Sequence, residues 1–253
     1  MRLTDKVAIV TGATSGFGQA IARLFASEGA HLILNARRAA SAQGLLEELA
    51  RGGSQAEFVE GDVGEERTAM ELAQRARARY GRIDILVLNA GIGTADATPF
   101  WDTTPEEFDR VMRTNVRAVW LCARAAVPLM PRGGSVVVMA SQQSYIVCEG
   151  NTAYAASKGA ALQLARGMAL DLAGRGIRVN ALCPGICDTP LTRHYIGRAA
   201  DAEACEASFR SLAPLNRFGT PEEIAQHTLF LASDQSSFIT GIGLLADGGT
   251  TLR

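Results

Sequence analysis

Short, almost entirely apolar segments alternate along this chain with longer segments of helical periodicity. The apolar segments predict seven strands, Val7–Val10, His31–Ala36, Ala56–Glu60, Ile83–Leu88, Ser135–Ala140, Arg178–Leu182 and Gly243–Ala246. The periodic segments predict six helices, Gly18–Glu28, Ala40–Arg51, Glu65–Tyr80, Pro105–Met130, Thr152–Ala173 and Pro221–Ala232. Because parallel strands need a crossover between them, this alternation predicts an α/β fold with a doubly wound parallel sheet of about seven strands and helices on both faces.

We expect a single domain over residues 1–253, because no linker, internal repeat or low-complexity tract divides the chain. The apolar fraction of 47% is enough for a sizeable core. The least regular stretch is Pro190–Pro214, which interrupts the alternation and exceeds the length of a usual connection. Long connections are often functional, so we expect a mobile substrate lid over residues 190–214.

Net charge, hydropathy and cysteine content indicate which partners, metals and cellular compartment to expect. With 25 basic and 26 acidic residues the net charge is −1, which argues against nucleic acid as a partner. No apolar run is long enough to span a bilayer and the first is too short for a signal peptide, so we expect a cytoplasmic protein with no membrane partner. The five cysteines form no paired framework, and Cys183 and Cys187 have no further ligands beside them, so we expect reduced thiols and no metal.

The segment "TGATSGFG" places three glycines, Gly12, Gly16 and Gly18, in the turn between the first predicted strand and helix. Free N–H groups and the positive end of the helix dipole make such a turn a site for phosphate. Gly12 would permit the turn, Gly16 the approach of a pyrophosphate, and Gly18 the packing of helix on strand. We therefore expect a Rossmann-like dinucleotide site whose turn also includes Thr14, Ser15 and Phe17.

The end of the second predicted strand, "LILNARR", bears on the choice of dinucleotide. An acidic residue there would bind the ribose 2′-hydroxyl, whereas a basic residue would meet a 2′-phosphate. This chain has Ala36 in place of the acid, followed by Arg37 and Arg38. Because an arginine fork binds phosphate bidentately, we expect NADP(H) to be preferred over NAD(H). The alternative is that both arginines are ordinary exposed side chains.

The segment "YAASK" places Tyr154 and Lys158 on one face of a predicted helix. The pKa of a free tyrosine is about 10, too high for proton release near neutrality. A neighbouring ammonium group and a cationic nicotinamide ring would favour the phenolate, so the pair predicts a Tyr154 general acid/base with a lowered pKa. The alternative is a solvated surface pair.

Two further polar residues stand where such a site would need them. Ser141 closes a predicted buried strand, and ligands of open α/β sheets lie beyond the carboxyl ends of strands. Asn115 lies on an apolar face of a predicted helix, so its amide must find partners. It is either a satisfied core amide or the anchor of a water that relays protons to Lys158.

Together these motifs resemble the short-chain dehydrogenase/reductase family over essentially the whole chain. The resemblance rests on "TGATSGFG", "DV" at Asp62-Val63, "NAG" at Asn89-Ala90-Gly91, "RTNV" with Asn115, Ser141, "YAASK", "PGICDTP" and the closing "ADGG". It implies a catalytic tetrad of Asn115, Ser141, Tyr154 and Lys158. It also implies hydride transfer between NAD(P)(H) and a carbonyl or secondary alcohol, in a homotetramer or homodimer.

The resemblance implies roles for the cofactor-binding residues as well. Asp62 and Val63 would contact the adenine, and Asn89 would hold the central strand. Lys158 would also bind the nicotinamide ribose, and Ile186 and Thr189 the carboxamide end. The remaining members of the predicted cofactor site are Ala90, Gly91, Tyr154, Pro184 and Gly185. NADP-preferring relatives often carry a basic residue at the position of Arg37, and often a second one where this chain has Ser15.

We therefore expect a short-chain alcohol dehydrogenase or carbonyl reductase acting on a small molecule. The substrate residues we expect are Ser141, Gln143, Glu149, Tyr154 and, in the lid, His194, which we do not expect to be catalytic. Polar side chains in "QQSYIVCEGN" favour a sugar, a polyol or another polar carbonyl compound. One alternative is a 3-oxoacyl-thioester reductase whose acidic carrier protein docks on Arg132 and Arg175. Another is a catalytically silent NADP(H)-binding module.

Overall fold

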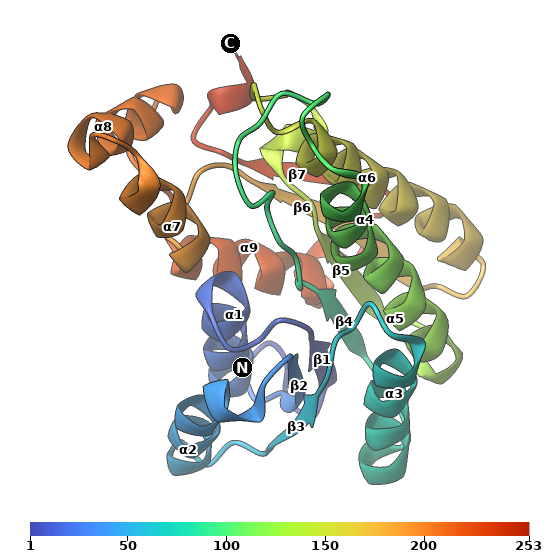
Figure 1. The fold of residues 1–253 in the computed structure, drawn as a ribbon. Coiled ribbons are helices and arrows are strands. Elements are labelled where there is room, and N and C mark those ends of the chain that lie inside the picture. Colours follow the sequence, from blue (N-terminus) through green and yellow to red (C-terminus); the bar gives the residue numbers. More distant parts are fainter. Residues whose placement is uncertain (253) are drawn as a thin grey trace.

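A computed structural model describes residues 1–252 and contains a seven-stranded parallel sheet at its centre (Figure 1). The strand order is β3-β2-β1-β4-β5-β6-β7. The strands are β1 (Val7–Val10), β2 (His31–Ala36), β3 (Ala56–Glu60), β4 (Ile85–Leu88), β5 (Ser135–Met139), β6 (Arg178–Pro184) and β7 (Gly243–Ala246). The chain reverses direction across the sheet between β1 and β4, and in such sheets ligands bind beyond the carboxyl ends of the strands at that point. The predicted fold class is confirmed.

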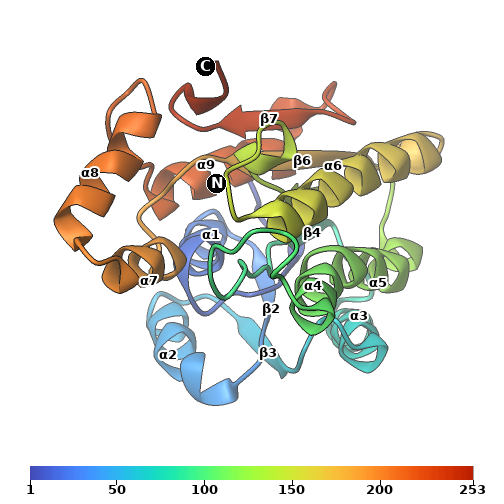
Figure 2. The same ribbon diagram turned by 45° about the horizontal axis from the view of Figure 1, so that its top comes forward.

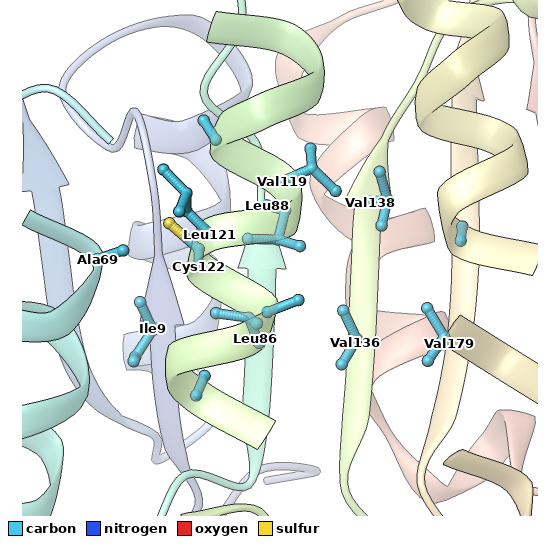
Figure 3. Packing of buried hydrophobic residues seen from close by; sticks show 14 of the residues in the cluster. Ile9, Ala69, Leu86, Leu88, Val119, Leu121, Cys122, Val136, Val138 and Val179 are labelled. Atoms are coloured by element: carbon cyan, nitrogen blue, oxygen red, sulfur yellow. The ribbon is translucent and has the colours of Figure 1, made fainter. Parts of the chain in front are cut away.

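Most strand residues are apolar because both faces of the sheet are covered. Successive residues of a strand point to opposite faces, so Ile85 and Val87 of β4 join one core cluster while Leu86 and Leu88 join the other. Figure 3 shows Leu86 and Leu88 on the face covered by the helix that carries Cys122. This explains why uninterrupted apolar runs, rather than alternation, signal the strands in this sequence.

Helices cover the sheet in two layers (Figure 2). They are α1 (Gly16–Ser27), α2 (Gln43–Arg51), α3 (Glu66–Tyr80), α4 (Pro105–Met112), α5 (Ala118–Ala126), α6 (Thr152–Ala173), α7 (Pro190–Arg198), α8 (Ala202–Leu212) and α9 (Pro221–Ala232). Residues of α1, α2 and α9 belong to one core cluster, and residues of α3, α5 and α6 belong to the other. Both layers therefore bury apolar surface against the same sheet.

The predicted helix Pro105–Met130 is wrong as a single element. It consists of α4, a π-helical turn at Arg113–Arg117, α5 and a short 3₁₀ turn at Val127–Leu129. The π turn carries Asn115, whose side chain bonds to two other segments of the chain, and π turns are frequent at functional sites. The amino end of α4 is as predicted, with the Thr104 hydroxyl accepting a hydrogen bond from Glu107 N at 3.2 Å.

The stretch Pro190–Pro214 is also more regular than predicted, because α7 and α8 occupy most of it. Thr189 caps α7 by accepting from Thr192 N at 3.3 Å, and Asp201 caps α8 by accepting from Ala204 N at 2.9 Å. Thr189-Pro190 repeats the Thr-Pro start that the sequence shows at Thr104 and Thr220, so this signal was present and not used. The role of this stretch as a substrate lid stays a prediction.

Residues 1–252 contain neither a membrane-spanning helix nor a cluster of metal ligands. None of the helices there is both long enough and apolar enough to cross a bilayer. In the same residues, no group of three or more His, Cys, Asp or Glu side chains lies together as metal ligands would.

Candidate active site

A cavity of about 440 Å³ opens beyond the carboxyl ends of the central strands, where the strand order reverses. Its walls come from the β1–α1 turn, from the segments that follow β2, β3, β4 and β5, from α6 and from the start of α7. Most of the residues predicted to bind a cofactor line it: Gly12, Thr14, Ser15, Gly16, Phe17, Arg37, Arg38, Asp62, Val63, Asn89, Ala90, Gly91, Tyr154, Lys158 and Thr189. The sheet thus brings together side chains from distant parts of the sequence.

The β1–α1 turn needs its glycines for two different reasons. Gly12 and Gly16 have φ values of +65° and +51°, which L side chains rarely adopt. A Cβ atom on Gly18 would lie 2.1 Å from the Gly12 carbonyl oxygen. Within residues 1–252, Ser15 makes no side-chain capping bond to α1, and the first turn of α1 carries no acid. This end of α1 faces the cavity and has the properties of a phosphate site.

Asparagine side chains hold the strand ends that frame the turn. Asn89 Nδ2 donates to the carbonyl oxygens of Thr11 at 2.9 Å and Gly12 at 3.1 Å. The Thr11 hydroxyl accepts from the backbone N–H groups of Asn89 and Ala90, each at 3.0 Å. Asn35 Nδ2 likewise joins β2 to the carbonyl oxygens of Val59 and Gly61. Thr11 and Asn35 were missed in the sequence, although a buried amide inside the apolar run of β2 is itself a signal.

The side of the cavity beyond β2 and β3 is positively charged. Arg37 and Arg38 follow the last residue of β2 and are exposed at the cavity wall. Across the described part of the chain, neither guanidinium forms an ion pair with an acid. Asp62 accepts from Gly64 N at 2.8 Å and pairs with Arg113 at 3.4 Å. The free arginines leave two cations available to an anionic ligand.

Tyr154 and Lys158 lie one helical turn apart on α6, as predicted. Lys158 Nζ donates to the Met139 carbonyl oxygen at 2.8 Å and lies 5.7 Å from the centre of the Tyr154 ring. Burial raises the pKa of Tyr154 to about 12, and the Ser141 hydroxyl acts in the opposite direction. Burial lowers the pKa of Lys158, which is only 4% exposed, to about 8. Burial is thus the largest influence on the pKa of Tyr154 in the chain by itself, and the lowering expected beside a bound nicotinamide ring stays a prediction.

Ser141 begins the turn that follows β5 and is buried beside Tyr154. Its Oγ accepts a hydrogen bond from Gln143 N at 3.1 Å. Because that bond uses only a lone pair, the hydroxyl proton remains available to donate to an oxygen atom in the cavity. Ser141 can therefore supply one donor, and the phenol of Tyr154 a second.

Asn115 is a fully engaged core amide. Its Nδ2 donates to Ile92 O at 2.8 Å and to Ser157 Oγ at 3.0 Å, and its Oδ1 accepts from Ile92 N at 2.9 Å. These bonds join the π turn to the β4–α4 loop and to α6. A Cβ atom on Gly91 would lie 3.4 Å from Asn115 Oδ1 and 3.2 Å from Lys158 Nζ, so the amide oxygen and the ammonium group share one small region. The proton-relay role of Asn115 stays a prediction.

The whole chain is similar to proteins of one group. The family model described as "Enoyl-(Acyl carrier protein) reductase" matches residues 12–251. The 3-oxoacyl-[acyl-carrier-protein] reductase FabG of Thermotoga maritima is 38% identical over 254 residues, which is 100% of each chain. Oxidoreductase UcpA of Salmonella typhimurium is 38% identical over 257 residues, covering 99% of this chain and 96% of that protein. A crystal structure of a short-chain type dehydrogenase/reductase from Mycobacterium marinum matches with a TM-score of 0.91 and 32% identity, over 99% of this chain and 97% of that chain.

The chain belongs to the short-chain dehydrogenase/reductase family. As a short-chain dehydrogenase/reductase it is an oxidoreductase that uses NAD(P)(H) and acts on a small molecule. The resemblance drawn from the sequence motifs is confirmed. The catalytically silent binding module is the less favoured of the two classes, because the relatives are oxidoreductases.

Several residues predicted for the site of this short-chain dehydrogenase/reductase lie elsewhere. Pro184, Gly185 and Ile186 are not part of the cavity wall, and Ile186 instead lines a second cavity near the end of β7. Glu149 is exposed in a separate groove. Gln143 is partly buried and its Oε1 has no hydrogen-bond partner among the described residues.

His194 is exposed on α7, whereas the neighbouring Tyr195 is partly buried. The Tyr195 hydroxyl donates to the Thr94 carbonyl oxygen at 2.6 Å, and Tyr195 lies close enough to Tyr154 to raise its pKa. Successive residues of a helix point about 100° apart, so only one of this pair can face the site. The sequence pattern "RHYIGR" could not decide which, because α7 was not predicted as a helix.

Proposed function

We propose that this enzyme is a carbonyl reductase and secondary-alcohol dehydrogenase that prefers NADP(H). The observation that carries the proposal is the convergence of Ser141, Tyr154 and Lys158 at the carboxyl end of β5, where Tyr154 and Lys158 line the same cavity as the glycine turn. NADP(H), when bound, would supply or accept the hydride. The glycine turn, Asp62, Val63 and Thr189 are the residues that would hold it.

The chain's own residues would handle the proton. With a pKa of about 12, the Tyr154 phenol is protonated at neutral pH and can give its proton to a carbonyl oxygen during reduction. Ser141 would donate a second hydrogen bond to that oxygen and stabilise the negative charge that develops on it. Lys158 would orient the ribose and favour the phenolate that remains, while its bond to Met139 O fixes its position.

The preference for NADP(H) is supported by charge at the far end of the cavity. Ala36 leaves the end of β2 without an acid, and Arg37 and Arg38 at the wall form no ion pair with any residue between 1 and 252. A guanidinium fork suits a 2′-phosphate, whereas a carboxylate would suit a ribose hydroxyl.

The decisive experiment follows NADPH absorbance with a panel of ketones, aldehydes and sugars, and compares the wild type with Tyr154→Phe. We expect the variant to bind NADPH as the wild type does and to lose at least about 1,000-fold in kcat, because the proton donor is gone. Phenylalanine keeps the ring and its packing, so unchanged NADPH affinity serves as the folding control. A variant that retains more than about a tenth of wild-type kcat would refute the assignment of Tyr154.

The alternative acyl-thioester activity is not favoured, although FabG is among the relatives. Arg132 and Arg175, the proposed docking residues for an acidic carrier, donate to the carbonyl oxygens of Gly174 and of Val127 and Met130. These segments lead into the amino ends of β5 and β6. The cavity lies beyond the carboxyl ends, at the opposite edge of the sheet, so a carrier on these arginines would not reach Tyr154.

A polar substrate finds partial support. Gln142 and Gln143 each keep a buried Oε1 atom without a partner among the described residues, and a substrate hydroxyl could satisfy one of them. In contrast, Asn151 already accepts from Thr94 Oγ1 at 3.2 Å, and Glu149 does not line the cavity that contains Tyr154. A sugar or polyol therefore stays a prediction, with Gln143 as its best-placed residue.

A homodimer or homotetramer is supported by apolar side chains left exposed on the helical layer of α3, α5 and α6, namely Met70, Trp120 and Leu170. The small residues Ala161, Ala165 and Ala169 do not contribute to that surface, because they are buried in the core of one subunit. Sedimentation analysis at several protein concentrations would test the oligomeric state.

A further inference from the structure

An exposed groove of about 520 Å³ lies beside the site and is not used by the chemistry described above. It is lined by the β4–α4 loop, through Phe100 and Trp101, and by the segment before α6, through Val147, Cys148 and Glu149. Phe100, Trp101 and Val147 are 66%, 71% and 69% exposed. Large apolar side chains gathered at the surface of one groove mark a binding site more often than isolated ones do.

The groove is a fixed structure, because its two walls are bonded to each other. Thr98 N donates to Gly150 O at 3.2 Å, and Thr94 Oγ1 donates to Asn151 Oδ1 at 3.2 Å. Gly150 has a φ of +73°, and a Cβ there would lie 2.9 Å from the Ala97 carbonyl carbon. The two loops lie against each other where α6 begins (Figure 2). Phe100 and Trp101 meet edge to face with ring centres 5.3 Å apart.

The groove adjoins the reacting residues. Thr152 lines it and starts α6, on which Tyr154 lies within the same turn. Cys148 also lines it, and its thiol is close enough to Tyr154 to act on the pKa of the phenol. The groove therefore lies beside the first turn of α6, next to the segment of chain that carries Tyr154.

The charge of the groove limits what that substituent can be. Glu149 is the single ionisable acid on its wall, and among the described residues no Lys, Arg or His lines it. Aromatic faces attract cations and apolar groups, and a carboxylate nearby disfavours an anion.

We propose that this groove is the second part of the substrate site and holds a flat apolar group, uncharged or positively charged, attached to the carbonyl compound. The proposal rests on the function proposed above. It assigns Trp101 and Phe100 to binding the substituent and Glu149 to selecting its charge. A small ketone would engage only Ser141 and Tyr154, whereas an aryl ketone would gain the contact with Trp101 as well.

A matched series of ketones tests this with the full chain and NADPH. The series is 2-butanone, 4-phenyl-2-butanone, and the phenyl compound carrying either a trimethylammonium or a carboxylate group at the para position. We expect kcat/KM to be at least about 10-fold higher for the phenyl and trimethylammonium compounds than for 2-butanone, because burying a ring against apolar surface strengthens binding. We expect the carboxylate compound to lose that gain.

Variants then show whether the gain in kcat/KM from the phenyl group depends on the residues of the groove. We expect Trp101→Ala to lower kcat/KM for 4-phenyl-2-butanone about 10-fold and to leave 2-butanone within about 2-fold. Phe238→Ala, which removes an exposed aromatic ring outside the groove, is the matched control and should change neither. Glu149→Lys should reverse the charge preference, favouring the carboxylate over the trimethylammonium compound. Equal loss with both ketones in Trp101→Ala, or no gain from the phenyl group in the wild type, overturns the proposal.

A binding measurement separates this proposal from the proposed reaction. In a Trp120→Phe background Trp101 is the only tryptophan, so its fluorescence reports on the groove. We expect 4-phenyl-2-butanol to quench it saturably and 2-butanol to leave it unchanged, whether or not any ketone is reduced. Failure to reduce every ketone with quenching intact refutes the proposed reaction alone. Absence of quenching refutes the groove.

Discussion

The cofactor half of the site is made by backbone geometry, whereas the substrate half is made by side chains that reach across from separate segments. In the cofactor half, a short turn after β1 is shaped by Gly12, Gly16 and Gly18, and Asn89 bonds to the carbonyl oxygens of that turn. In the substrate half, Tyr195 of α7 bonds to the β4–α4 loop, and Arg198 pairs with Asp96 of the same loop at 2.6 Å. The glycine turn itself is local in sequence, although Asn89 reaches it from 77 positions away, while the contacts of the substrate half join residues about a hundred positions apart.

The difference teaches where substitutions should act. A substitution in the glycine turn puts a side chain where the backbone conformation or the close packing allows only glycine. It should therefore lower both the stability of the fold and the affinity for NADP(H). A change in a cross-loop contact removes one hydrogen bond among several, so it should affect substrate binding more than stability.

The largest effect is expected from Gly18→Ala. Its Cβ would lie 2.1 Å from Gly12 O and 2.6 Å from Asn89 Nδ2, and backbone atoms in a clamped turn cannot move aside cheaply. We expect a loss of about 3 kcal/mol in the free energy of unfolding and on the order of 100-fold in NADPH affinity. Thermal denaturation and fluorescence titration measure both. Gly44→Ala on α2 is the control, because among the described residues nothing lies within 4 Å of that Cβ. Normal NADPH binding by Gly18→Ala would contradict the view that backbone geometry makes the cofactor half.

The next effect concerns Lys158, which lies where the halves meet. Burial lowers its pKa from 10.5 to about 8, so below pH 8 the buried charge destabilises the folded state by about 3 kcal/mol. As pH rises from 8 to 10.5 the folded protein loses this proton before the unfolded chain does, so stability should rise over that range. Above pH 10 the raised pKa of Tyr154 acts in the opposite direction, because the unfolded chain then loses a proton that the folded protein keeps.

The variant Lys158→Met tests whether the buried charge of Lys158 lowers the free energy of unfolding below pH 8. We expect the variant to be inactive yet more stable than the wild type near pH 7, with the difference shrinking between pH 8 and 10.5. Urea denaturation at a series of pH values measures it. Parallel stability curves for the two proteins across that range would contradict the assigned pKa.

Arg37→Ala sharpens the comparison within the cofactor half. A charge-assisted bond contributes about 1.5–3 kcal/mol, so kcat/KM with NADPH should fall about 10-fold to 100-fold. The value with NADH should stay within about 3-fold, because the 2′-phosphate is the only difference between the cofactors. Arg51→Ala, at the exposed end of α2 and outside the cavity wall, is the control. Equal losses with NADPH and NADH would show that Arg37 does not read the phosphate.

The smallest effect is expected from Tyr195→Phe, in the substrate half. Removing the hydroxyl breaks the 2.6 Å bond to Thr94 O and should cost about 1 kcal/mol. We expect KM for the ketone to rise a few-fold while NADPH affinity is unchanged, as steady-state kinetics would show. Tyr80→Phe, whose hydroxyl accepts from Arg79 on α3, is the matched control. A larger change in NADPH affinity than in KM for the ketone would contradict the assignment of Tyr195 to the substrate half.

The parts of the fold that could be predicted are those set by local pattern. The apolar runs gave the strands within a few residues, and "TGATSGFG" located the turn, because each signal is a pattern of consecutive residues that can be recognised without knowing what packs against it. The break in Pro105–Met130 could not be predicted, because the π turn accompanies bonds from Asn115 to Ile92 and Ser157. The helices α7 and α8 could have been predicted from Thr189-Pro190 and Asp201.

By itself, the sequence determined the order of elements, the glycine turn and which residue types could take part in hydride transfer. Only the tertiary structure decided that Tyr195 rather than His194 is bonded to the β4–α4 loop, that Arg132 and Arg175 lie at the opposite edge of the sheet, and that burial raises the Tyr154 pKa. The reason is physical: an apolar run or a glycine-rich turn is a pattern of consecutive residues, whereas side-chain orientation and desolvation depend on segments that meet only in the folded protein.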